Sequence, residues 1–408
     1  MSEAKLLFRK YAERLLQAAQ DESISLAISK SVANWRERKA KALARFPDTV
    51  ELAREVRRLK ENSLERLDEL VQQASRTLEE NGAKVYQAAS ADEAREIIGQ
   101  LIGTDKVVVA AKSITAEEVG LRPYIESLGN EFWETDVGEF IQQLRREKPM
   151  HYGLPSLHVT REEVAKVLTG SFGREILPEA SAEVRAIREF LRSKYSKADV
   201  GISGCNVLAA DTGSAILIEN EGNIRAVTNA PLHILLVGIE KVVPTLHDAF
   251  KVAEVTWRYC GFTAPAYLDI ISAPSATSDI EFNLVRGASG PLELHVVFLD
   301  GGRRTLAQNP LLKEALYCLR CGNCLLECPV FQLAAGYYGD HGHLGGIGAI
   351  WAAYVTGSLA EAAPLAYTCL RCGRCTEVCP LSIDTGRLIA ELRHTIYDSG
   401  RCRRLAHS

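Results

Sequence analysis

A cysteine pattern that occurs twice constrains this chain more than any other feature of its sequence. Each copy reads C-x-x-C-x-x-C-x-x-x-C-P, and the two copies contain Cys318, Cys321, Cys324, Cys328 and Pro329, then Cys369, Cys372, Cys375, Cys379 and Pro380. This spacing is typical of proteins that bind cubane iron-sulfur clusters. Three thiolates on a tight loop can reach three corners of one cube, whereas the fourth lies too far along the chain to complete that site.

The fourth cysteine of each run is therefore expected to bind the cluster of the other run. We assign the first cluster to Cys318, Cys321, Cys324 and Cys379, and the second cluster to Cys369, Cys372, Cys375 and Cys328. The proline after each run turns the chain away from the cube. The pattern predicts two 4Fe-4S clusters and a protein that transfers electrons.

Zinc and disulfide bonds are the alternatives. A zinc site needs only four ligands, so the third and fourth cysteines, the proline and the repeat exceed what a zinc ribbon requires. The N-terminal sequence MSEAKLLFRK has no apolar signal-peptide core, and closely spaced thiols in a cytosolic context favour metal ligands over disulfides. The remaining cysteines, Cys205, Cys260 and Cys402, are expected to be free, and Cys205 to be a small buried side chain.

Composition excludes several classes of function. The 408 residues predict two to three domains, and 48 basic against 52 acidic residues leave a net charge of -4, so no nucleic-acid partner is expected. No dinucleotide-binding, P-loop or zinc-protease motif occurs. Residues 344–360 lack charges but are glycine-rich, so we expect no transmembrane segment. A cytoplasmic location is expected, and peripheral contact with a membrane is left open.

The sequence divides into three regions. Residues 1–82 have apolar positions at helical intervals and predict a helical N-terminal region; residues 83–303 predict an α/β domain; residues 304–408 hold the two-cluster module. Strands are expected at 106–111, 131–135, 157–160, 215–218, 234–237 and 292–299, and helices at 91–101, 161–168 and 182–197. This alternation of strands and helices favours a largely parallel sheet.

Ligands bind such sheets in the loops beyond the carboxyl ends of the strands. Small and polar residues occupy these loops, and the candidates for a carboxylate-binding or docking site are Lys112, Ser113, Asn206, Asp211, Thr212 and Gly213. Lys112 offers a cation, Ser113 and Thr212 offer hydroxyl groups, and Gly213 permits close approach of backbone amides. The alternative is that these residues only form turns and cap strands. No catalytic residue is assigned.

Four further stretches resemble a known family. They are AAKSITAEEVGL, WETDVGEFI, ADVGISGCNVLAADTGSAILIENEGNIRAVTNAP and LELHVVFLDGGRR, and the two cluster runs follow them. Together they resemble the lactate utilization iron-sulfur protein B family, in which a LUD domain is joined to a ferredoxin-type module with two 4Fe-4S clusters. The resemblance implies that the LUD domain folds like sugar-phosphate isomerases and CoA-transferases.

The resemblance also implies a function. It indicates a subunit of a cytoplasmic complex that oxidises L-lactate to pyruvate, with a second LUD-domain subunit and a cysteine-rich subunit similar to those of heterodisulfide reductases as partners. Lactate releases two electrons whereas a cubane carries one, so a two-electron centre is expected elsewhere or bound non-covalently. The alternative is an electron-transfer and scaffold subunit of another dehydrogenase or heterodisulfide-reductase-like complex, with a non-catalytic LUD domain.

Overall fold

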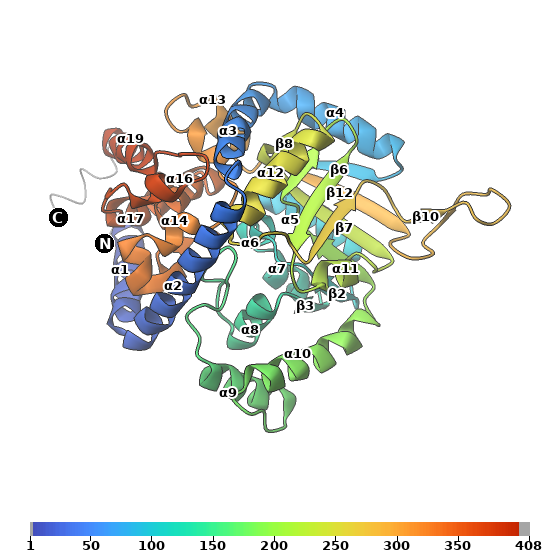
Figure 1. The fold of residues 1–408 in the computed structure, drawn as a ribbon, viewed down its shortest axis with the longest axis horizontal. Coiled ribbons are helices and arrows are strands. Elements are labelled where there is room, and N and C mark those ends of the chain that lie inside the picture. The colour runs from blue at the N-terminus through green and yellow to red at the C-terminus, as the bar shows by residue number, and fades with distance from the viewer. Residues whose placement is uncertain (1–2, 400–408) are drawn as a thin grey trace.

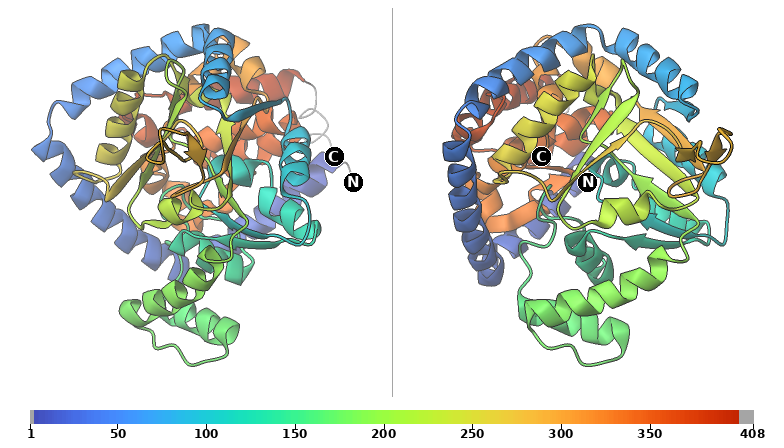
Figure 2. Two further views of the ribbon diagram at one scale, coloured as in Figure 1. Left: turned by 90° about the vertical axis from the view of Figure 1, so that its right-hand side faces the viewer. Right: turned by 45° about the vertical axis from the view of Figure 1, so that its right-hand side comes forward.

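The computed structural model of the protein describes residues 3–399, so Cys402 lies outside the described residues. The predicted helical N-terminal region is confirmed. Within the described chain it contains the helices α1 (Glu3–Gln20), α2 (Glu22–Arg45), α3 (Thr49–Glu65) and α4 (Leu67–Glu80). These helices follow one another around the outside of the molecule (Figure 2). Along α2 the buried residues Ile24, Ile28, Val32 and Trp35 recur at helical spacing and form one apolar face.

A parallel sheet forms the centre of the next region, which confirms the predicted α/β class (Figure 1). Its six strands within residues 3–399 lie in the order β1 (Lys84–Ala88), β12 (Glu293–Leu299), β7 (Leu232–Gly238), β4 (Val200–Ser203), β2 (Val107–Ala110) and β3 (Glu131–Glu134). All neighbouring strands are parallel. Their carboxyl ends therefore lie at one edge of the sheet.

Helices on the sheet connect these strands. They are α5 (Ala91–Ile102), α6 (Ile114–Glu118), α7 (Leu121–Ser127), α8 (Val137–Arg145), α9 (Arg161–Phe172), α10 (Ala180–Tyr195) and α11 (Asn223–Val227). Several begin at a side-chain cap: Ser90 caps α5 and Asp136 caps α8 by accepting a backbone N–H three residues later. These caps direct the chain from a strand end straight into the next helix.

A second sheet packs beside the first and corrects one prediction. It contains β8 (Val242–Val243), β5 (Val207–Ala209), β6 (Ser214–Glu219) and β9 (Tyr267–Ile271), in this order, and α12 (Leu246–Tyr259) lies against it. The segment 215–218 was expected in the parallel sheet, but β6 pairs antiparallel with β5 and β9. A short turn joins β5 directly to β6, and so short a connection permits only antiparallel pairing.

The expected strand at 157–160 is also wrong. These residues form turns between α8 and α9, because their polar side chains bind locally instead of joining the sheet. His158 Nε2 lies 3.2 Å from the Glu147 carboxylate, and the Thr160 and Glu163 side chains form a capping box at the start of α9. A strand-like run of apolar and β-branched residues was thus overridden by helix capping.

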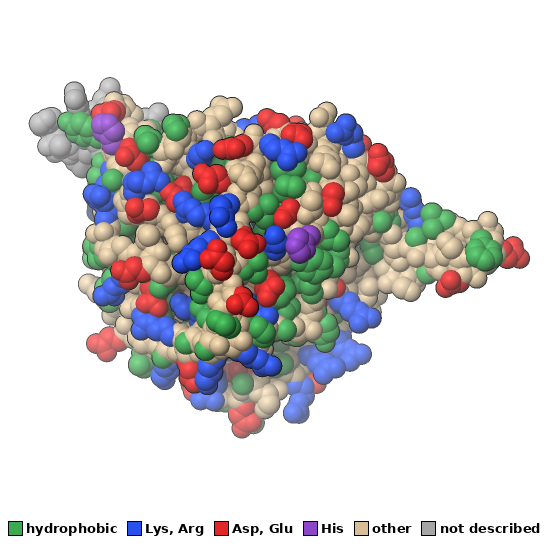
Figure 3. Space-filling model, turned by 45° about the horizontal axis from the view of Figure 1, so that its top comes forward, with side chains coloured by type: hydrophobic (Ala, Val, Ile, Leu, Met, Phe, Trp, Pro, Cys, Tyr) green, Lys and Arg blue, Asp and Glu red, His purple; other side chains and the backbone are tan. Residues whose placement is uncertain are grey.

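A narrow arm extends from the body of the molecule (Figures 1 and 3). It carries β10 (Ala276–Thr277) and β11 (Val285–Arg286), which pair antiparallel. Ile280, Phe282 and Leu284 lie near its tip and are 64%, 95% and 67% exposed. The arm packs few of its side chains against the rest of the chain.

The last region is a compact set of short helices and two small strands. Its elements are α13 (Arg303–Gln308), η2 (Lys313–Tyr317), α14 (Asn323–Leu326), α15 (Pro329–Ala334), η3 (Ala335–Tyr337), β13 (Gly339–Asp340), β14 (His343–Leu344), α16 (Gly345–Val355), α17 (Leu359–Thr368), α18 (Arg374–Val378) and α19 (Thr385–Asp398). The uncharged helix α16 is buried by α17, α19 and β14. Among residues 3–399, no helix combines the length and apolarity that crossing a bilayer requires.

The N-terminal helices connect this region to the rest of the molecule. Helix α1 packs on α15 and α17, α2 packs on α15 and α12, and α3 packs on α12. One hydrophobic core includes residues of both sheets together with Leu316, Ile350 and Trp351 of the last region. The domain boundaries given above stay predictions, and the core is continuous across the one at 303/304.

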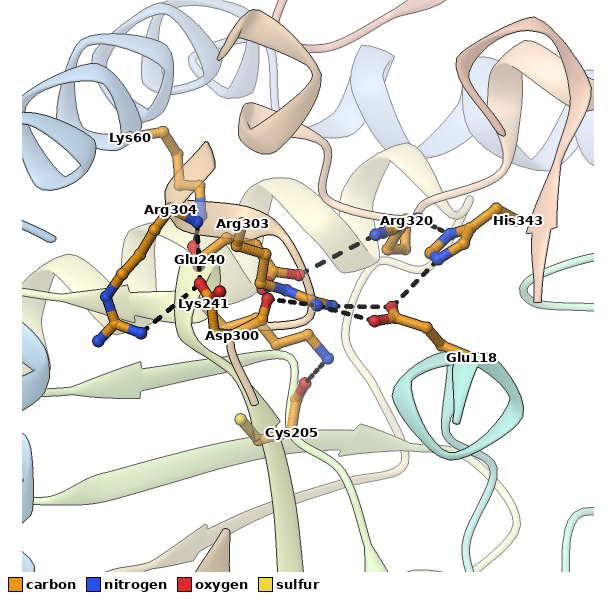
Figure 4. Close-up of polar contacts among 10 residues, drawn as sticks. All are labelled: Lys60, Glu118, Cys205, Glu240, Lys241, Asp300, Arg303, Arg304, Arg320 and His343. Carbon is orange, nitrogen blue, oxygen red and sulfur yellow. Dashed lines mark hydrogen bonds and ion pairs between the residues drawn. The ribbon is translucent and has the colours of Figure 1, made fainter. Parts of the chain in front are cut away.

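A buried ion-pair network centred on Arg303 joins the α/β domain to the first cysteine run (Figure 4). Arg303 Nη1 and Nη2 each donate a 2.8 Å hydrogen bond to Glu118, and Arg303 Nε donates to Glu240. His343 Nε2 lies 3.0 Å from the Glu118 carboxylate, and Arg320 Nη1 lies 2.8 Å from His343 Nδ1. Despite burial, Arg303 and His343 hold the pKa of Glu118 well below its usual range.

We expect Arg303→Met to lower the thermal unfolding midpoint strongly, because it leaves the buried carboxylates of Glu118 and Glu240 without their main partner. Removing one member of a buried ion pair costs about 3–5 kcal/mol. Arg304→Met is the matched control: the Arg304 side chain is 36% exposed and pairs with Asp68 at the surface, so its loss should cost less than about 1 kcal/mol. Equal midpoints for the two variants would contradict the role given to the network.

Candidate cluster sites and the adjoining cavity

The two cysteine runs adopt the same local backbone conformation. Arg320 and Arg371, each two residues after the first cysteine of its run, have φ values of 59° and 53°. Each donates its backbone N–H to that cysteine: Arg320 N to Cys318 Sγ at 3.4 Å, and Arg371 N to Cys369 Sγ at 3.4 Å. A left-handed residue at this position turns the loop back on itself, so that N–H groups point at sulfur.

The thiols of the first assigned set lie close together. Burial, followed by the neighbouring thiolates of Cys318, Cys321 and Cys379, raises the pKa of the Cys324 thiol well above its ordinary value. Burial, with Cys321 and Cys318, likewise raises the pKa of Cys379 to about 12. The fourth cysteine of the second run therefore lies beside the first three cysteines of the first run.

The second assigned set is also brought together. Cys328, Cys369, Cys372 and Cys375 line one small cavity, which Cys324 also borders. Burial raises the pKa of Cys328 to about 11, with Cys369 and Cys375 adding to the increase. Thiolates that raise one another's pKa values need a cationic partner, and the iron atoms of a cubane supply one. The ligand assignment stays a prediction, and the thiols gather in the two sets that it requires.

Asn323 fixes the first cysteine loop to two other parts of the chain. Its Nδ2 donates to Cys321 Sγ at 3.3 Å and to the Tyr259 carbonyl at 2.9 Å, while its Oδ1 accepts from Trp35 Nε1 at 2.9 Å. Trp35 belongs to α2 and Tyr259 ends α12. An amide buried among these three groups has most of its hydrogen-bonding capacity satisfied, which holds the loop in one position.

His151 holds the same loop from the α/β domain. Its Nδ1 accepts from the backbone N–H groups of Gly153 and Leu154, at 3.0 and 3.1 Å, so Nε2 carries the proton and donates to the Gly322 carbonyl at 3.1 Å. Burial lowers the pKa of His151 to about 4. The imidazole is therefore neutral at physiological pH and acts as a hydrogen-bonding strut.

A cavity of about 350 Å³ lies between the strand-end loops and the first cysteine loop. On one side it is lined by residues that follow β2, β4 and β7, namely Lys112, Ser113, Gly204, Cys205, Asn206 and Lys241, the last residue of η1 (Ile239–Lys241). On the other side it is bordered by Cys318, Leu319 and Arg320, and the aromatic residues Trp35, Tyr152, Trp257 and Phe262 complete the wall. Its volume is within the range of about 300–1,000 Å³ that is usual for small-molecule sites.

The structure brings together only part of the predicted loop site. Lys112, Ser113 and Asn206 line the cavity, whereas Asp211, Thr212 and Gly213 do not. Asp211 accepts from the Leu246 N–H, the Thr212 carbonyl accepts from the Asn81 side chain, and Gly213 has a φ of 63° against Leu78 of α4. These three residues form the turn between β5 and β6 and hold it beneath α4.

Lys112 is already paired within the cavity. Its Nζ lies 2.7 Å from Asp136, and the side chains are 27% and 11% exposed. Although burial opposes the change, Asp136 and Glu139 raise the pKa of Lys112 to about 12. Ser113 Oγ accepts from Ala116 N at 3.2 Å as the cap of α6. The charge of Lys112 is thus matched by protein carboxylates, which weakens it as a contact for an anionic ligand.

Other cavity residues were missed by the sequence reasoning. Lys241 comes three residues after the end of β7, and its position after a parallel strand could have identified it. Lys60 lies on α3 and Arg320 lies inside the cysteine run. Neither has a local signal that relates it to a strand-end loop. Cys205 and Cys260 also line the cavity as free thiols, and burial raises the pKa of Cys205 to about 11.

Three carboxylates gather beside the Lys112 end of the cavity. Glu117, Glu134 and Glu139 each place an oxygen within 4.8 Å of the other two. Burial and then Glu117 raise the pKa of Glu134 to about 8, and burial with Glu134 raises the pKa of Glu139 well above its usual range. At neutral pH this cluster therefore retains protons.

Comparison with known proteins identifies two domains, one containing most of the strand-end loops and one containing the cysteine runs. The LUD domain model matches residues 71–299, and the 4Fe-4S dicluster domain model matches residues 314–383. Lactate utilization protein B of Bacillus licheniformis is 31% identical, over 97% of this chain and 82% of its own. The protein of the same name from Geobacillus thermodenitrificans is 32% identical, over 83% of this chain and 70% of its own.

The chain belongs to the lactate utilization protein B family. It therefore carries a LUD domain and a ferredoxin-type domain with two 4Fe-4S clusters, as the cysteine pattern predicted. Among solved structures, a DUF162 family protein from Deinococcus radiodurans matches 57% of this chain and 98% of its own at 16% identity. Its TM-score of 0.31 is too low to support an argument about the fold.

Crossed ligation predicts which cysteine variants resemble each other. Protein purified without oxygen should contain about eight irons and eight labile sulfides. Cys379→Ala should lose the same spectroscopic signal as Cys318→Ala, and Cys328→Ala the same signal as Cys369→Ala, with about half of the iron kept in each. Iron analysis and electron paramagnetic resonance of the reduced variants measure this. A Cys379→Ala spectrum that matches Cys369→Ala would refute the assignment.

The carboxylate cluster predicts a stability that falls with rising pH. The pKa of Glu134 is about 8 in the folded protein against 4.5 in the reference state. Between these values the folded state keeps a proton that the unfolded state releases, so stability is lost as pH rises from 5 to 8. Glu134→Gln should reduce this loss by more than about 1 kcal/mol. Glu131→Gln, on the exposed side of the same strand, should leave it unchanged in denaturant unfolding at both pH values.

Proposed function

We propose that this protein is the iron-sulfur electron-transfer subunit of a cytoplasmic complex that oxidises L-lactate to pyruvate. The observation that carries the proposal is the cavity of about 350 Å³ with two different walls. One wall consists of loops at the carboxyl ends of parallel strands, where small molecules bind in such sheets. The other wall contains Cys318, a predicted ligand of the first cluster. An electron donor in the cavity would lie beside that cluster.

The two clusters suit a relay better than the chemical step. Oxidation of lactate removes two electrons and two protons, whereas each cluster, when bound, accepts and passes on one electron at a time. The chain's own residues contribute by holding the cluster loop: Asn323 and His151 fix it against α2, α12 and the α/β domain. The group that takes the electron pair from lactate then belongs to another subunit or to a molecule bound in the cavity.

The partners we propose are a second LUD-domain subunit and a cysteine-rich subunit similar to those of heterodisulfide reductases. Membership of the lactate utilization protein B family supports a role as a subunit of a complex. Cys372 is exposed, unlike the cysteines of the first set. The second cluster site therefore comes closest to the surface there, where a partner subunit can approach it.

A second function has one observation in its favour. Lys112, the cation predicted to bind a substrate carboxylate, is paired with Asp136 at 2.7 Å. If no small molecule enters the cavity, the LUD domain serves as a scaffold, and the chain is an electron-transfer subunit of another dehydrogenase or heterodisulfide-reductase-like complex. Binding of a small acid to the chain distinguishes the two functions.

Titration of the intact, cluster-containing chain with L-lactate, pyruvate and oxalate tests the proposal. Trp35 and Trp257 line the cavity, so binding should change tryptophan fluorescence in a saturable way. Trp257→Phe should remove much of this change. Trp133→Phe should not, because Trp133 packs against Phe140 and Phe190 outside the cavity. Absence of both a fluorescence change and a heat of binding would favour the scaffold.

A further inference from the structure

Three cationic side chains, Lys60, Lys241 and Arg320, line the cavity beside the first cysteine loop, and the ion pairs behind them decide which of these charges are matched. The ten residues drawn in Figure 4 include five cationic side chains, Lys60, Lys241, Arg303, Arg304 and Arg320, and three carboxylates, Glu118, Glu240 and Asp300. His343 adds no charge, because burial lowers its pKa to about 4. Arg304 also pairs with Asp68, whereas among residues 3–399 neither Lys60 nor Lys241 forms an ion pair with a carboxylate.

The arginines take all three carboxylates. Arg303 occupies Glu118 and Glu240, Arg304 Nη1 lies 3.6 Å from Asp300, and Arg320 Nη2 lies 4.0 Å from Glu240. The guanidinium groups outcompete the lysines because their planar forks match carboxylate geometry.

The two lysines are left with backbone carbonyl groups. Lys60 Nζ donates to the Glu240 carbonyl oxygen, and Lys241 Nζ donates to the Cys205 carbonyl oxygen at 2.7 Å. Lys60 is only 4% exposed, and burial lowers its pKa to about 8. A carbonyl satisfies one of three N–H donors of an ammonium group and does not neutralise its charge. Both lysines also line the cavity.

The opposite end of the cavity has the opposite charge. Asp136, Glu219 and Glu221 line it there, together with Lys112. Burial and then Asp136 raise the pKa of Glu221 to about 7, which reflects the concentration of acids around it. An anionic ligand would be repelled from this end and attracted to the lysines beside the cysteine loop.

We propose that Lys241, with Lys60 behind it, forms the oxyanion subsite of this cavity and binds the carboxylate of a 2-hydroxy or 2-oxo acid beside Cys318. The inference deepens the proposed function and rests on it. It moves the carboxylate contact from Lys112, whose charge Asp136 matches, to the cations that the protein leaves unmatched.

The test compares two lysines of the same cavity. Lys241→Gln removes a charge at the cysteine-loop end and keeps an amide that can donate to the Cys205 carbonyl; Lys112→Gln removes a charge at the acidic end. Calorimetric titration of the cluster-containing chain with oxalate and pyruvate should show affinity reduced by about tenfold or more in Lys241→Gln. Lys112→Gln should stay within about threefold of the unsubstituted chain, and Lys241→Arg should restore most of the affinity.

Folding and cluster loading are measured in parallel. Iron content should be unchanged in Lys241→Gln and Lys112→Gln. The thermal unfolding midpoint should be unchanged in Lys241→Gln and lower in Lys112→Gln, which loses its ion pair with Asp136. If Lys241→Gln does not fold, Lys241→Arg and Lys60→Gln replace it. Lys60→Gln should then weaken oxalate binding several-fold, because it removes the second unmatched charge, while Lys241→Arg should bind normally.

The outcomes separate this inference from the proposed function. Loss of binding in Lys112→Gln with normal binding in Lys241→Gln would overturn the inference and leave the proposed function intact. Normal binding in Lys241→Gln together with a lower midpoint potential of the first cluster would also overturn it, because the lysines would then serve the cluster thiolates. If the unsubstituted chain binds neither oxalate nor pyruvate, the proposed function fails as well.

Discussion

The guanidinium group of Arg303 is the contact on which the placement of the first cysteine loop depends. Arg303 begins α13, shortly after the carboxyl end of β12, and binds Glu118 of α6 and Glu240 of η1; all three side chains are nearly inaccessible to solvent. His343 and Arg320 extend the network into the cysteine run. Buried charges tolerate few arrangements, because each must be both paired and hydrogen-bonded. The ion pairs of this network therefore fix the edge of the sheet and the cluster loop relative to each other.

This arrangement of ion pairs leaves two lysines beside the cavity without a carboxylate partner in the part of the chain that the structure describes. Two carboxylates are divided between Arg303 and Arg320, so Lys60 and Lys241 are left with carbonyl oxygens only. Burial of such a charge opposes folding unless an anion balances it. Function and stability are thus coupled at this wall: the same arrangement that fixes the loop creates the positive site to which an acidic ligand is drawn.

Features set by neighbouring residues could be predicted from the sequence. Contacts between residues that are far apart in the chain could not. The cysteine spacing is local and predicted the two-cluster domain, which the matched dicluster domain confirms. The strand pattern is also local and predicted β2, β3, β7 and β12 of the parallel sheet, but it missed β1 and β4. The strand at 157–160 failed because Thr160 caps a helix instead. Lys60 meets Glu240 across 180 residues of chain, and no local pattern relates them. Asp211 and Gly213 resembled a ligand loop, because turn chemistry and ligand chemistry use the same residues.

The two cluster sites also differ in their surroundings, and this difference suits electron transfer from the enclosed site to the exposed one. The first site borders the cavity through Cys318 and is enclosed by α2, α12 and the Arg303 network. The second site reaches the surface at Cys372, next to Leu370, which is 65% exposed. Solvent exposure and nearby charge both change the reduction potential of a cluster. A positively charged, enclosed first site and an exposed second site are thus expected to differ in potential, even though their cysteine runs have the same spacing.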